Sequence, residues 1–365
     1  MVYNVIGLMS GSSLDGLDIV FTALDETRGQ WKFDIVEAEC IEYDQEMRDA
    51  LCNAPNMPLA DFLKLDTQYG RYLGEQINKF IDKHRLYHKV HFVASHGHTV
   101  FHDPASQTTK QIGDGASIAA LTGLPVISDL RNMDIALGGQ GAPIVPIGDK
   151  LLFGNFDYWL NIGGIANMTV KDGDKMIAFD ICPANQPMNK LAQREGKDFD
   201  YEGEIAMTGE ILPDVLKQLN NQDFYNLPAP KSLSNEYCMQ LAAPVIDSDK
   251  AANDLLRTTV EWIVTQIAEA VKKYPTGKEE ASLLSTGGGS LNNFLAEQLR
   301  EKLAPLKVNV VVPYEQVANF KEALVMALIG TLRWREETNT FMQSTGASRD
   351  SIGGAIWMGH SYNGN

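Results

Sequence analysis

The stretch that decides the fold is Ile6–Asp18, IGLMSGSSLDGLD, in which an apolar run meets a turn rich in glycine, serine and aspartate. Tyr3–Met9 and Leu17–Leu24, on either side of that turn, are both apolar, and two such runs joined in this way predict a β-hairpin. Trp31–Tyr43 is a candidate third strand. The chain is therefore expected to open with an antiparallel sheet.

The same order of elements recurs in the second half. Asp157–Ile162, a glycine turn, Ala166–Val170 and Met176–Asp180 predict a second set of three strands. In both halves, strands and helices then alternate. Helical spacing of apolar residues covers 59–83, 113–122, 205–220, 251–274, 291–303 and 321–337, and further strands are expected at 90–95, 125–130, 281–285 and 307–312. This order predicts an α/β fold with mixed sheets flanked by helices.

The chain length predicts two domains, since 365 residues exceed the usual size of one. Gly138–Pro146, GGQGAPIVP, is dense in glycine and proline and is the best candidate for a hinge. We expect residues 1–137 together with 345–365 to form an N-terminal domain. Residues 138–344 are expected to form a C-terminal domain.

Composition excludes several classes of function. The formal net charge of -16, without a long basic run, disfavours nucleic acid and anionic membranes as partners. No apolar stretch is long enough to span a bilayer, and Met1–Val5 has no basic segment typical of a signal peptide. The four cysteines show no C-x-x-C spacing, so we expect reduced thiols and a cytoplasmic location.

Two interpretations fit the turn of the first hairpin. Gly11, Ser12 and Ser13 can direct several backbone N–H groups at one point, which favours a phosphate. Asp15 and Asp18 are oxygen donors, and one of them could orient water around Mg²⁺. The same residue types also form ordinary turns, so this segment alone leaves both interpretations open.

Two further glycine segments follow predicted strands. Gly163 and Gly164 lie in NIGGIAN, and Gly287–Gly289 lie in LLSTGGGSLNNFL, ahead of a predicted helix whose N-terminus favours negative groups. A dinucleotide fingerprint is incomplete because Asn292 stands where its third glycine belongs. The chain also lacks the G-x-x-x-x-G-K-[ST] motif of P-loop enzymes. A nucleotide held by opposed glycine hairpins fits this pattern.

Asp180 ends the third predicted strand of the second half. In α/β sheets, residues at this end usually face a ligand, and a carboxylate there suits a general base acting on a hydroxyl or on water. The competing interpretation is a cap for the following helix.

A histidine segment and an arginine complete the polar candidates. SHGHTVFH, Ser95–His102, contains His96 and His98 but no cysteine or acid to complete a zinc set, so we interpret these histidines as buried and hydrogen-bonded beside a polar pocket. Arg131 lies between two aspartates. It fits either a structural ion cluster or a clamp for a substrate carboxylate.

Taken in order, these motifs resemble the anhydro-N-acetylmuramic acid kinase family over about residues 5–350. The most specific are GGQGAP after the DLR segment, and NIGGIAN ahead of FDICPAN. The resemblance implies a two-domain actin-like (ribonuclease H-like) kinase fold with an ATP and substrate cleft between the domains. It also implies ATP, Mg²⁺ and a homodimer. The family's reaction opens the 1,6-anhydro ring with water while the 6-oxygen takes the γ-phosphoryl group, giving N-acetylmuramic acid 6-phosphate.

The resemblance also implies roles for individual residues. Asp180 matches the family's catalytic base, and Asp15 is expected to hold the metal through water. The ATP and phosphate contacts implied are Gly11, Ser12, Ser13, Asp15, Gly163, Gly164, Gly287, Gly288 and Gly289. The residues expected to face the sugar are His96, Arg131 and Glu322.

The chain departs from the family pattern near the base and the sugar. Cys182 and Ala184 replace two glycines, Asn189 stands where an aspartate is usual, and His98 replaces a glutamine. Asn132 and Met133 likewise replace arginines. Two alternatives therefore stay open: a kinase of the same fold for a related sugar, and a non-catalytic nucleotide-binding homologue. A panel of sugars distinguishes the first, and nucleotide binding without sugar-stimulated turnover distinguishes the second.

Overall fold

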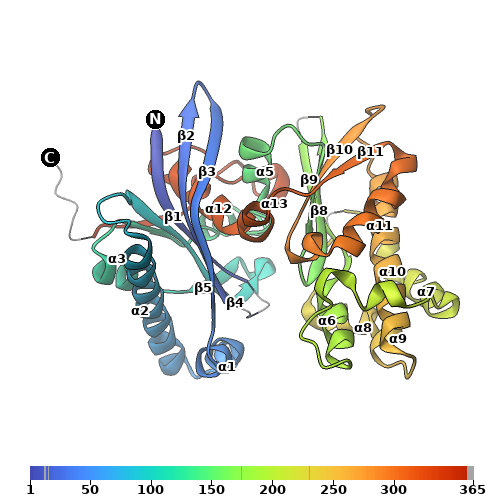
Figure 1. Cartoon of the computed structure of the whole chain (residues 1–365). Helices are drawn as coiled ribbons and strands as arrows, with labels where there is room; N and C mark the ends of the chain where they lie inside the picture. Colours follow the sequence, from blue (N-terminus) through green and yellow to red (C-terminus); the bar gives the residue numbers. More distant parts are fainter. Residues whose placement is uncertain (12–13, 15, 174, 230, 360–365) are drawn as a thin grey trace. The chain divides into compact units, whose positions relative to one another are not determined.

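The computed structural model describes residues 1–11, 14, 16–173, 175–229 and 231–359 (Figure 1). The chain divides into two compact units, Met1–Gly154 with Phe320–Asn365, and Asn155–Asn319. The C-terminal segment thus returns to the unit that contains the N-terminus. The changes between units at 154/155 and 319/320 differ from the domain boundaries expected from the sequence, at 137/138 and 344/345.

The first unit is built on one mixed sheet with the strand order β12-β6-β4-β1-β2-β3. β1, β2 and β3 are antiparallel neighbours, whereas β4 runs parallel to β1 and β6 runs parallel to β4. β5 pairs with β4, and β12 pairs with β6, both in antiparallel orientation. The strands are β1 (Val2–Ser10), β2 (Gly16–Thr27), β3 (Gln30–Glu42), β4 (Phe92–Asp103), β5 (Thr108–Ile112), β6 (Val126–Ser128) and β12 (Ala355–Trp357).

Helices cover both faces of this sheet. On one face, α2 (Leu59–His84) and α3 (Gly115–Thr122) pack their apolar sides against β1 and β2 in one core (Figure 1). The buried stripe of α2 includes Leu65, Tyr69, Leu73, Ile77 and Phe80, as its helical spacing predicted. On the other face lies α12 (Glu315–Trp334), so close that a Cβ on Gly7 would fall 2.1 Å from the Ala323 carbonyl oxygen. The shorter helices are α1 (Gln45–Asn53), α4 (Asn132–Ala136), α5 (Pro146–Leu152) and α13 (Met342–Thr345).

The second unit repeats the plan, with the strand order β11-β10-β7-β8-β9. β7, β8 and β9 are antiparallel neighbours, β10 runs parallel to β7, and β11 runs parallel to β10. The strands are β7 (Tyr158–Ile162), β8 (Ile165–Asp172), β9 (Lys175–Pro183), β10 (Ala281–Thr286) and β11 (Val308–Val311). The helices are α6 (Asn185–Gln193), α7 (Pro213–Asn220), α8 (Asn235–Leu241), α9 (Ala243–Ile246), α10 (Ala252–Lys273) and α11 (Asn293–Leu303).

In each unit a three-strand antiparallel meander is extended from its first strand by two parallel strands. The first unit adds β4 and β6 to β1, and the second adds β10 and β11 to β7. This is the strand arrangement of the ribonuclease H-like, actin-type fold, present twice. The predicted fold class, α/β with mixed sheets flanked by helices, is confirmed.

One predicted helix is wrong. Residues 205–220 do not form a single helix, because only a 3-10 turn, Ala206–Thr208, and α7 (Pro213–Asn220) are present. Gly209 ends the turn where the backbone approaches α10, and a Cβ there would fall 2.2 Å from the Asn253 carbonyl oxygen. Pro213 then opens α7, as expected for a residue that lacks an amide hydrogen and cannot continue a helix.

A buried ion pair explains why α5 belongs to the first unit. Lys321 on α12 places its Nζ 2.5 Å from Oδ1 of Asp149 on α5, and the two side chains are 7% and 2% exposed. The ammonium group also lies 5.5 Å from the centre of the Phe153 ring. This contact ties residues 146–153 to α12, beyond the Gly138–Pro146 segment that was expected to mark the boundary.

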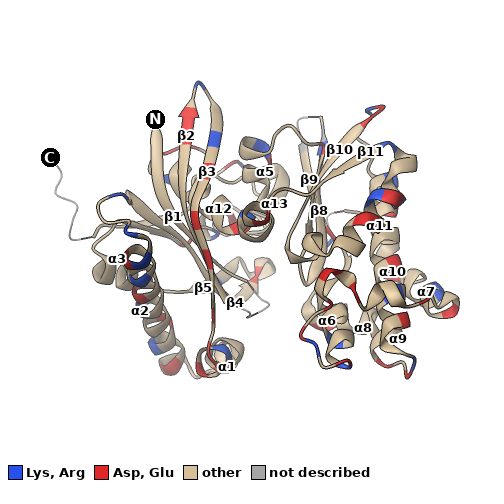
Figure 2. Ribbon diagram, viewed as in Figure 1, with Lys and Arg blue, Asp and Glu red and all other residues tan. Residues whose placement is uncertain are grey.

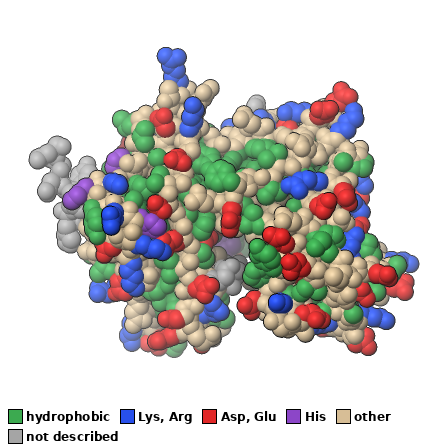
Figure 3. Space-filling model, viewed as in Figure 1, with side chains coloured by type: hydrophobic (Ala, Val, Ile, Leu, Met, Phe, Trp, Pro, Cys, Tyr) green, Lys and Arg blue, Asp and Glu red, His purple; other side chains and the backbone are tan. Residues whose placement is uncertain are grey.

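The surface carries charges of both signs. Figure 2 shows charged residues along α2 and α11 but few along the strands of the second sheet. On the face seen in Figure 3, acidic and basic side chains are interspersed with apolar ones. None of the helices in the described part of the chain is long and apolar enough to cross a membrane.

Candidate active site

In the second unit, the structure brings the two glycine segments together. β7 and β10 are parallel neighbours, with Asn161 opposite Thr286, so their carboxyl ends meet at one edge of the sheet. The Gly163-Gly164 turn follows β7, and Gly287 follows β10 directly. This edge is where open α/β sheets bind ligands.

Gly287 occupies a backbone conformation that only glycine adopts easily, with φ +85° and ψ 160°. A Cβ at this position would fall 2.5 Å from Asn161 Oδ1 and 2.7 Å from the Ile162 carbonyl oxygen. The side-chain amide of Asn185, Nδ2, donates to the same Ile162 carbonyl oxygen at 3.3 Å and connects the start of α6 to the turn. Backbone from three segments is therefore packed closely around this edge.

Gly287→Ala is expected to destabilise the second unit by about 1–3 kcal/mol, the usual cost of holding such a residue in a sparsely populated backbone region. The measurement is chemical denaturation of the full chain. Gly288→Ala is the matched control for stability, because a Cβ there meets only Asn185 Nδ2, at 3.9 Å. Equal stability of the two variants would contradict the expectation.

Asp180 lies within β9, beside an irregularity in the strand pairing. Asn167 on β8 pairs with Asp180, but the preceding Ala166 pairs with Cys182, so β9 carries one extra residue here. Such bulges redirect side chains and are frequent next to active sites. β9 continues to Pro183, and the N-cap of α6 is Ala184 without a side-chain bond, so Asp180 does not cap that helix. The helix-cap interpretation is wrong.

One oxygen of the Asp180 carboxyl group, Oδ2, accepts a hydrogen bond. The Leu233 amide donates to Oδ2 at 2.7 Å, and the Asp180 amide donates to the Lys231 carbonyl oxygen at 2.9 Å. Burial raises the pKa of Asp180 to about 6, although the Leu233 hydrogen bond and the charge of Lys231 act in the opposite direction. A carboxylate with such a pKa is mostly ionised at neutral pH yet basic enough to accept a proton.

Sequence reasoning missed Lys231 as a functional residue. Its Nζ donates to the Phe224 carbonyl oxygen at 3.0 Å and lies 4.2 Å from the centre of the Phe224 ring. Burial lowers the pKa of Lys231 to about 8, and the charge of Lys273 contributes to this shift. In the sequence, Lys231 opens the segment KSLSNEY, whose residue types do not by themselves point to a role for the lysine.

In the first unit, the structure brings His96 and Arg131 into direct contact. Arg131 Nε donates to His96 Nε2 at 2.8 Å, and Arg131 Nη1 donates to the Gly141 carbonyl oxygen at 2.6 Å. His96 Nδ1 bonds the Gly97 carbonyl oxygen at 2.9 Å, so the imidazole is neutral, with its proton on Nδ1. Burial, reinforced by the charge of Arg131, lowers the pKa of His96 to about 3.

Acidic groups surround this pair. Asp134 is buried, accepting the Gly141 amide at 2.7 Å and the Thr345 hydroxyl at 2.6 Å. Burial lowers the pKa of Arg131 to about 10, while the nearby charges of Glu322 and Asp134 act against that shift. The guanidinium group thus lies among carboxylates, as the ion-cluster interpretation predicts, while its role as a clamp for a substrate carboxylate stays a prediction.

A small polar cavity of about 140 Å³ adjoins His96. Ser95, Gln111, the N-terminal end of α3, Asp129 and Trp357 contribute to its lining. Ser95 Oγ and Gln111 Oε1 are buried, and neither has a hydrogen-bond partner within the described part of the chain. Buried polar atoms without partners are uncommon, so these two favour a polar occupant.

The first hairpin is described only in part. Ser12, Ser13 and Asp15 lie outside the described residues, so their predicted phosphate and metal roles stay predictions. Gly11 follows Ser10, the last residue of β1. Ser10 Oγ is 2.9 Å from Nδ1 of His98 and accepts the Tyr43 hydroxyl at 2.7 Å, and Tyr43 in turn contacts the Tyr69 hydroxyl. His98 thus bonds the residue next to the turn.

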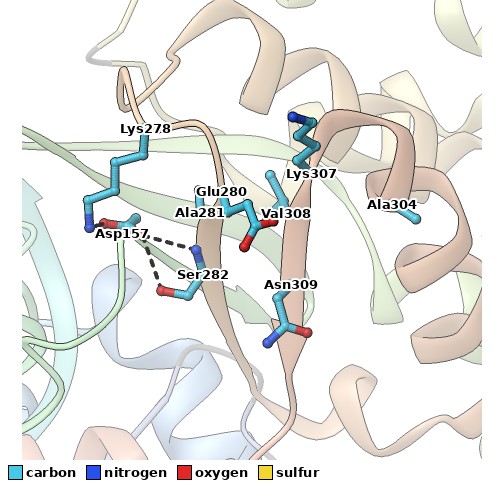
Figure 4. Close-up of a pocket in the computed structure, with 9 residues that line it drawn as sticks. All are labelled: Asp157, Lys278, Glu280, Ala281, Ser282, Ala304, Lys307, Val308 and Asn309. Atoms are coloured by element: carbon cyan, nitrogen blue, oxygen red, sulfur yellow. Dashed lines mark hydrogen bonds and ion pairs between the residues drawn. The ribbon is translucent and has the colours of Figure 1, made fainter.

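A second groove of this unit lies away from Asp180 and the glycine segments. Its volume is about 610 Å³, and it lies over the amino ends of β10 and β11, lined by residues such as Asp157, Lys278 and Ser282 (Figure 4). Asp157 is already fully engaged there, because it pairs with Lys278 and accepts bonds from the Ser282 amide and hydroxyl. The glycine segments lie at the opposite ends of the same strands.

The structure thus combines two units of one strand arrangement, glycine turns at a carboxyl edge of the second sheet, and a half-buried aspartate whose pKa is raised. A family model described as anhydro-N-acetylmuramic acid kinase matches residues 3–359. The "Anhydro-N-acetylmuramic acid kinase" of Aliivibrio fischeri is 33% identical over 364 residues, covering 96% of this chain and 98% of that protein. A protein of the same name from a Sulfurovum species is 31% identical over 368 residues, covering 97% and 98%. The chain belongs to the anhydro-N-acetylmuramic acid kinase family, and is therefore an ATP-dependent kinase.

Proposed function

We propose that the chain opens the 1,6-anhydro ring of anhydro-N-acetylmuramic acid with water and phosphorylates the 6-oxygen. Asp180 takes a proton from the water while the water oxygen bonds to C1 of the sugar and the C1–O6 bond breaks. O6 then takes the γ-phosphoryl group of ATP, releasing ADP and giving N-acetylmuramic acid 6-phosphate. The observation that carries this proposal is the Asp180 carboxyl group, half-buried beside the strand bulge and with a pKa of about 6.

We assign ATP to the glycine segments. Gly163, Gly164 and Gly287–Gly289 gather at one sheet edge, where backbone can approach phosphates closely. Gly11, Ser12 and Ser13 complete the phosphate contacts in this proposal, and Asp15 holds Mg²⁺ through water. Phosphoryl transfer depends mainly on such positioning and charge neutralisation rather than on covalent chemistry by the protein.

We assign the sugar to His96, Arg131 and Glu322. Arg131 Nη2 offers a charged donor for the substrate carboxylate, and the neutral His96 fixes the orientation of the guanidinium group. Ser95 Oγ and Gln111 Oε1 are buried atoms suited to hydroxyl or amide groups of the same ligand. A cytoplasmic location and a homodimer belong to this proposal as well.

Arg131→Lys is expected to raise the KM for the sugar about tenfold or more, because a hydrogen bond to a charged group contributes roughly 1.5–3 kcal/mol. Lysine keeps the charge but cannot bond His96, Gly141 and a ligand from one planar fork. Steady-state kinetics with varied sugar at saturating ATP measures the effect. An unchanged KM would remove Arg131 from the sugar site.

The experiment that tests the proposed function is ADP release from Mg-ATP with and without 1,6-anhydro-N-acetylmuramic acid, together with the mass of the product. The expected product gains one water and one phosphoryl group. If another amino sugar stimulates release and this one does not, the chain is a kinase for a related sugar. Nucleotide binding without stimulation by any sugar would indicate a non-catalytic homologue.

A further inference from the structure

The segment 231–233 makes two hydrogen bonds to Asp180, one to its backbone and one to its side chain. The Lys231 carbonyl oxygen accepts the Asp180 backbone amide at 2.9 Å, and the Leu233 amide donates to Asp180 Oδ2 at 2.7 Å. Because both the backbone and the side chain of Asp180 are bound, the direction of its carboxyl group depends on where this segment lies.

Lys231 is itself anchored. Its ammonium group is bound to the Phe224 carbonyl oxygen at 3.0 Å and lies over two aromatic rings, 4.2 Å from the centre of Phe224 and 5.8 Å from that of Tyr225. An ammonium group held over aromatic rings keeps its place better than a free surface lysine. Lys231 therefore carries its positive charge at a fixed place in the segment that binds the Asp180 backbone.

From these contacts we propose that Lys231 is a positioning residue for Asp180: its backbone fixes the strand position of the base, and its anchored ammonium group stabilises the ionised carboxylate. The inference rests on the proposed role of Asp180 as general base. Leu233 holds Oδ2 in this arrangement, which directs the other carboxylate oxygen toward the substrate water.

The charged and titratable groups around the pair are few. Lys231 acts on Asp180 directly, and Lys273 on α10 acts on Lys231. The other titratable neighbours are the thiols of Cys182 and Cys238 and the phenol of Tyr225. Burial raises the pKa of all three, so they stay neutral at physiological pH. Lys231 is thus the one positive charge that lowers the pKa of Asp180 among the described residues.

The test compares Lys231→Met, Lys231→Arg and Lys273→Met in the full chain. Lys231→Met should move the acidic limb of the kcat/KM profile to higher pH by about one unit, a tenfold loss of rate below the limb. The rate at pH 8 should change much less, because Asp180 is ionised there in either protein. Lys231→Arg should restore the limb because it restores the charge.

Lys273→Met is the matched control. Lys273 binds the Asn226 and Leu227 carbonyl oxygens in the same region but does not contact Asp180, so the limb should stay where it is in the wild type. Equal losses at all pH values in Lys231→Met, without rescue by arginine, would reduce Lys231 to a purely structural role and overturn the inference.

A second readout separates this inference from the proposed function. Titration of the Asp180 carboxyl carbon by NMR in protein labelled with ¹³C at aspartate, assigned with Asp180→Asn, needs no turnover. If the wild type ignores every sugar but Lys231→Met still raises the titration midpoint, the proposed function fails and the electrostatic coupling stands. If turnover is normal and the midpoint is unchanged, only the inference about Lys231 fails.

Discussion

Asp180→Asn is expected to lower sugar-stimulated ADP release by about 10²–10⁴-fold, the usual contribution of a positioned general base. Asparagine has nearly the same shape and can still accept the hydrogen bond from the Leu233 amide, so the site should keep its structure. It cannot take a proton from water. The measurement is the initial rate of ADP release at pH 8, with Mg-ATP and 1,6-anhydro-N-acetylmuramic acid both saturating.

Asp157→Asn is the matched control for this substitution. Asp157 is a buried aspartate of the same unit, but it lies at the amino end of the neighbouring strands, in the groove of Figure 4. Its replacement changes the charge by the same amount and should leave the rate close to that of the wild type. If Asp180→Asn retained most of the activity, another group would have to act as the base.

The assignment of Asp180 as the general base also predicts how kcat/KM depends on pH. The base works only when ionised, and burial raises the pKa of Asp180 to about 6. Activity should therefore be nearly constant above this value and fall about tenfold for each pH unit below it, once protonation dominates. A profile of kcat/KM between pH 4.5 and 8 measures the limb; its absence would argue against a base with this pKa.

The second large effect is expected on stability rather than on rate. Lys321→Met removes the buried ammonium group that pairs with Asp149, and breaking a buried ion pair by removing one of its members costs roughly 3–5 kcal/mol. Chemical denaturation of the full chain should show the transition of the first unit shifted to lower denaturant. Because the chain forms two compact units, the curve is fitted with one or two transitions as its shape requires.

Two comparisons make this expectation specific. Lys302→Met breaks the pair with Glu261, in which the lysine is 37% exposed, and such partly exposed pairs contribute only about 0–1 kcal/mol. The double variant Asp149→Leu with Lys321→Met removes both charges and should recover much of the lost stability. If Lys321→Met cost no more than Lys302→Met, the buried pair would not be what joins α5 to α12.

Local patterns predicted most of the elements in this chain. The apolar spacing of α2 and the alternation of strands and turns before Asp180 follow from nearby residues, and each predicted strand overlaps a strand of the structure. The helix expected over 205–220 failed because the pattern overlooked Gly209 and Pro213, where a close backbone approach and a missing amide hydrogen end regular structure.

Contacts between distant residues could not be predicted in this way. The bond between Arg131 and His96 joins β4 to the segment after β6, and Leu233 reaches Asp180 from the loop before α8. The ion pair of Asp149 with Lys321, which places α5 in the first unit, is equally remote in sequence. Such contacts depend on the packing of whole elements, which spacing along the chain does not encode.

The repetition of one strand arrangement also bears on how this protein can evolve. The polar group around Arg131 lies on β4 and in the segment after β6 of the first unit, whereas Asp180 and the glycine turns after β7 and β10 belong to the second. Loop substitutions in one copy leave the scaffold of the other unchanged. Under the proposed assignment, substitutions in the loops around Arg131 can therefore alter recognition of the acceptor without disturbing the sheet that carries Asp180 and the second set of glycine turns.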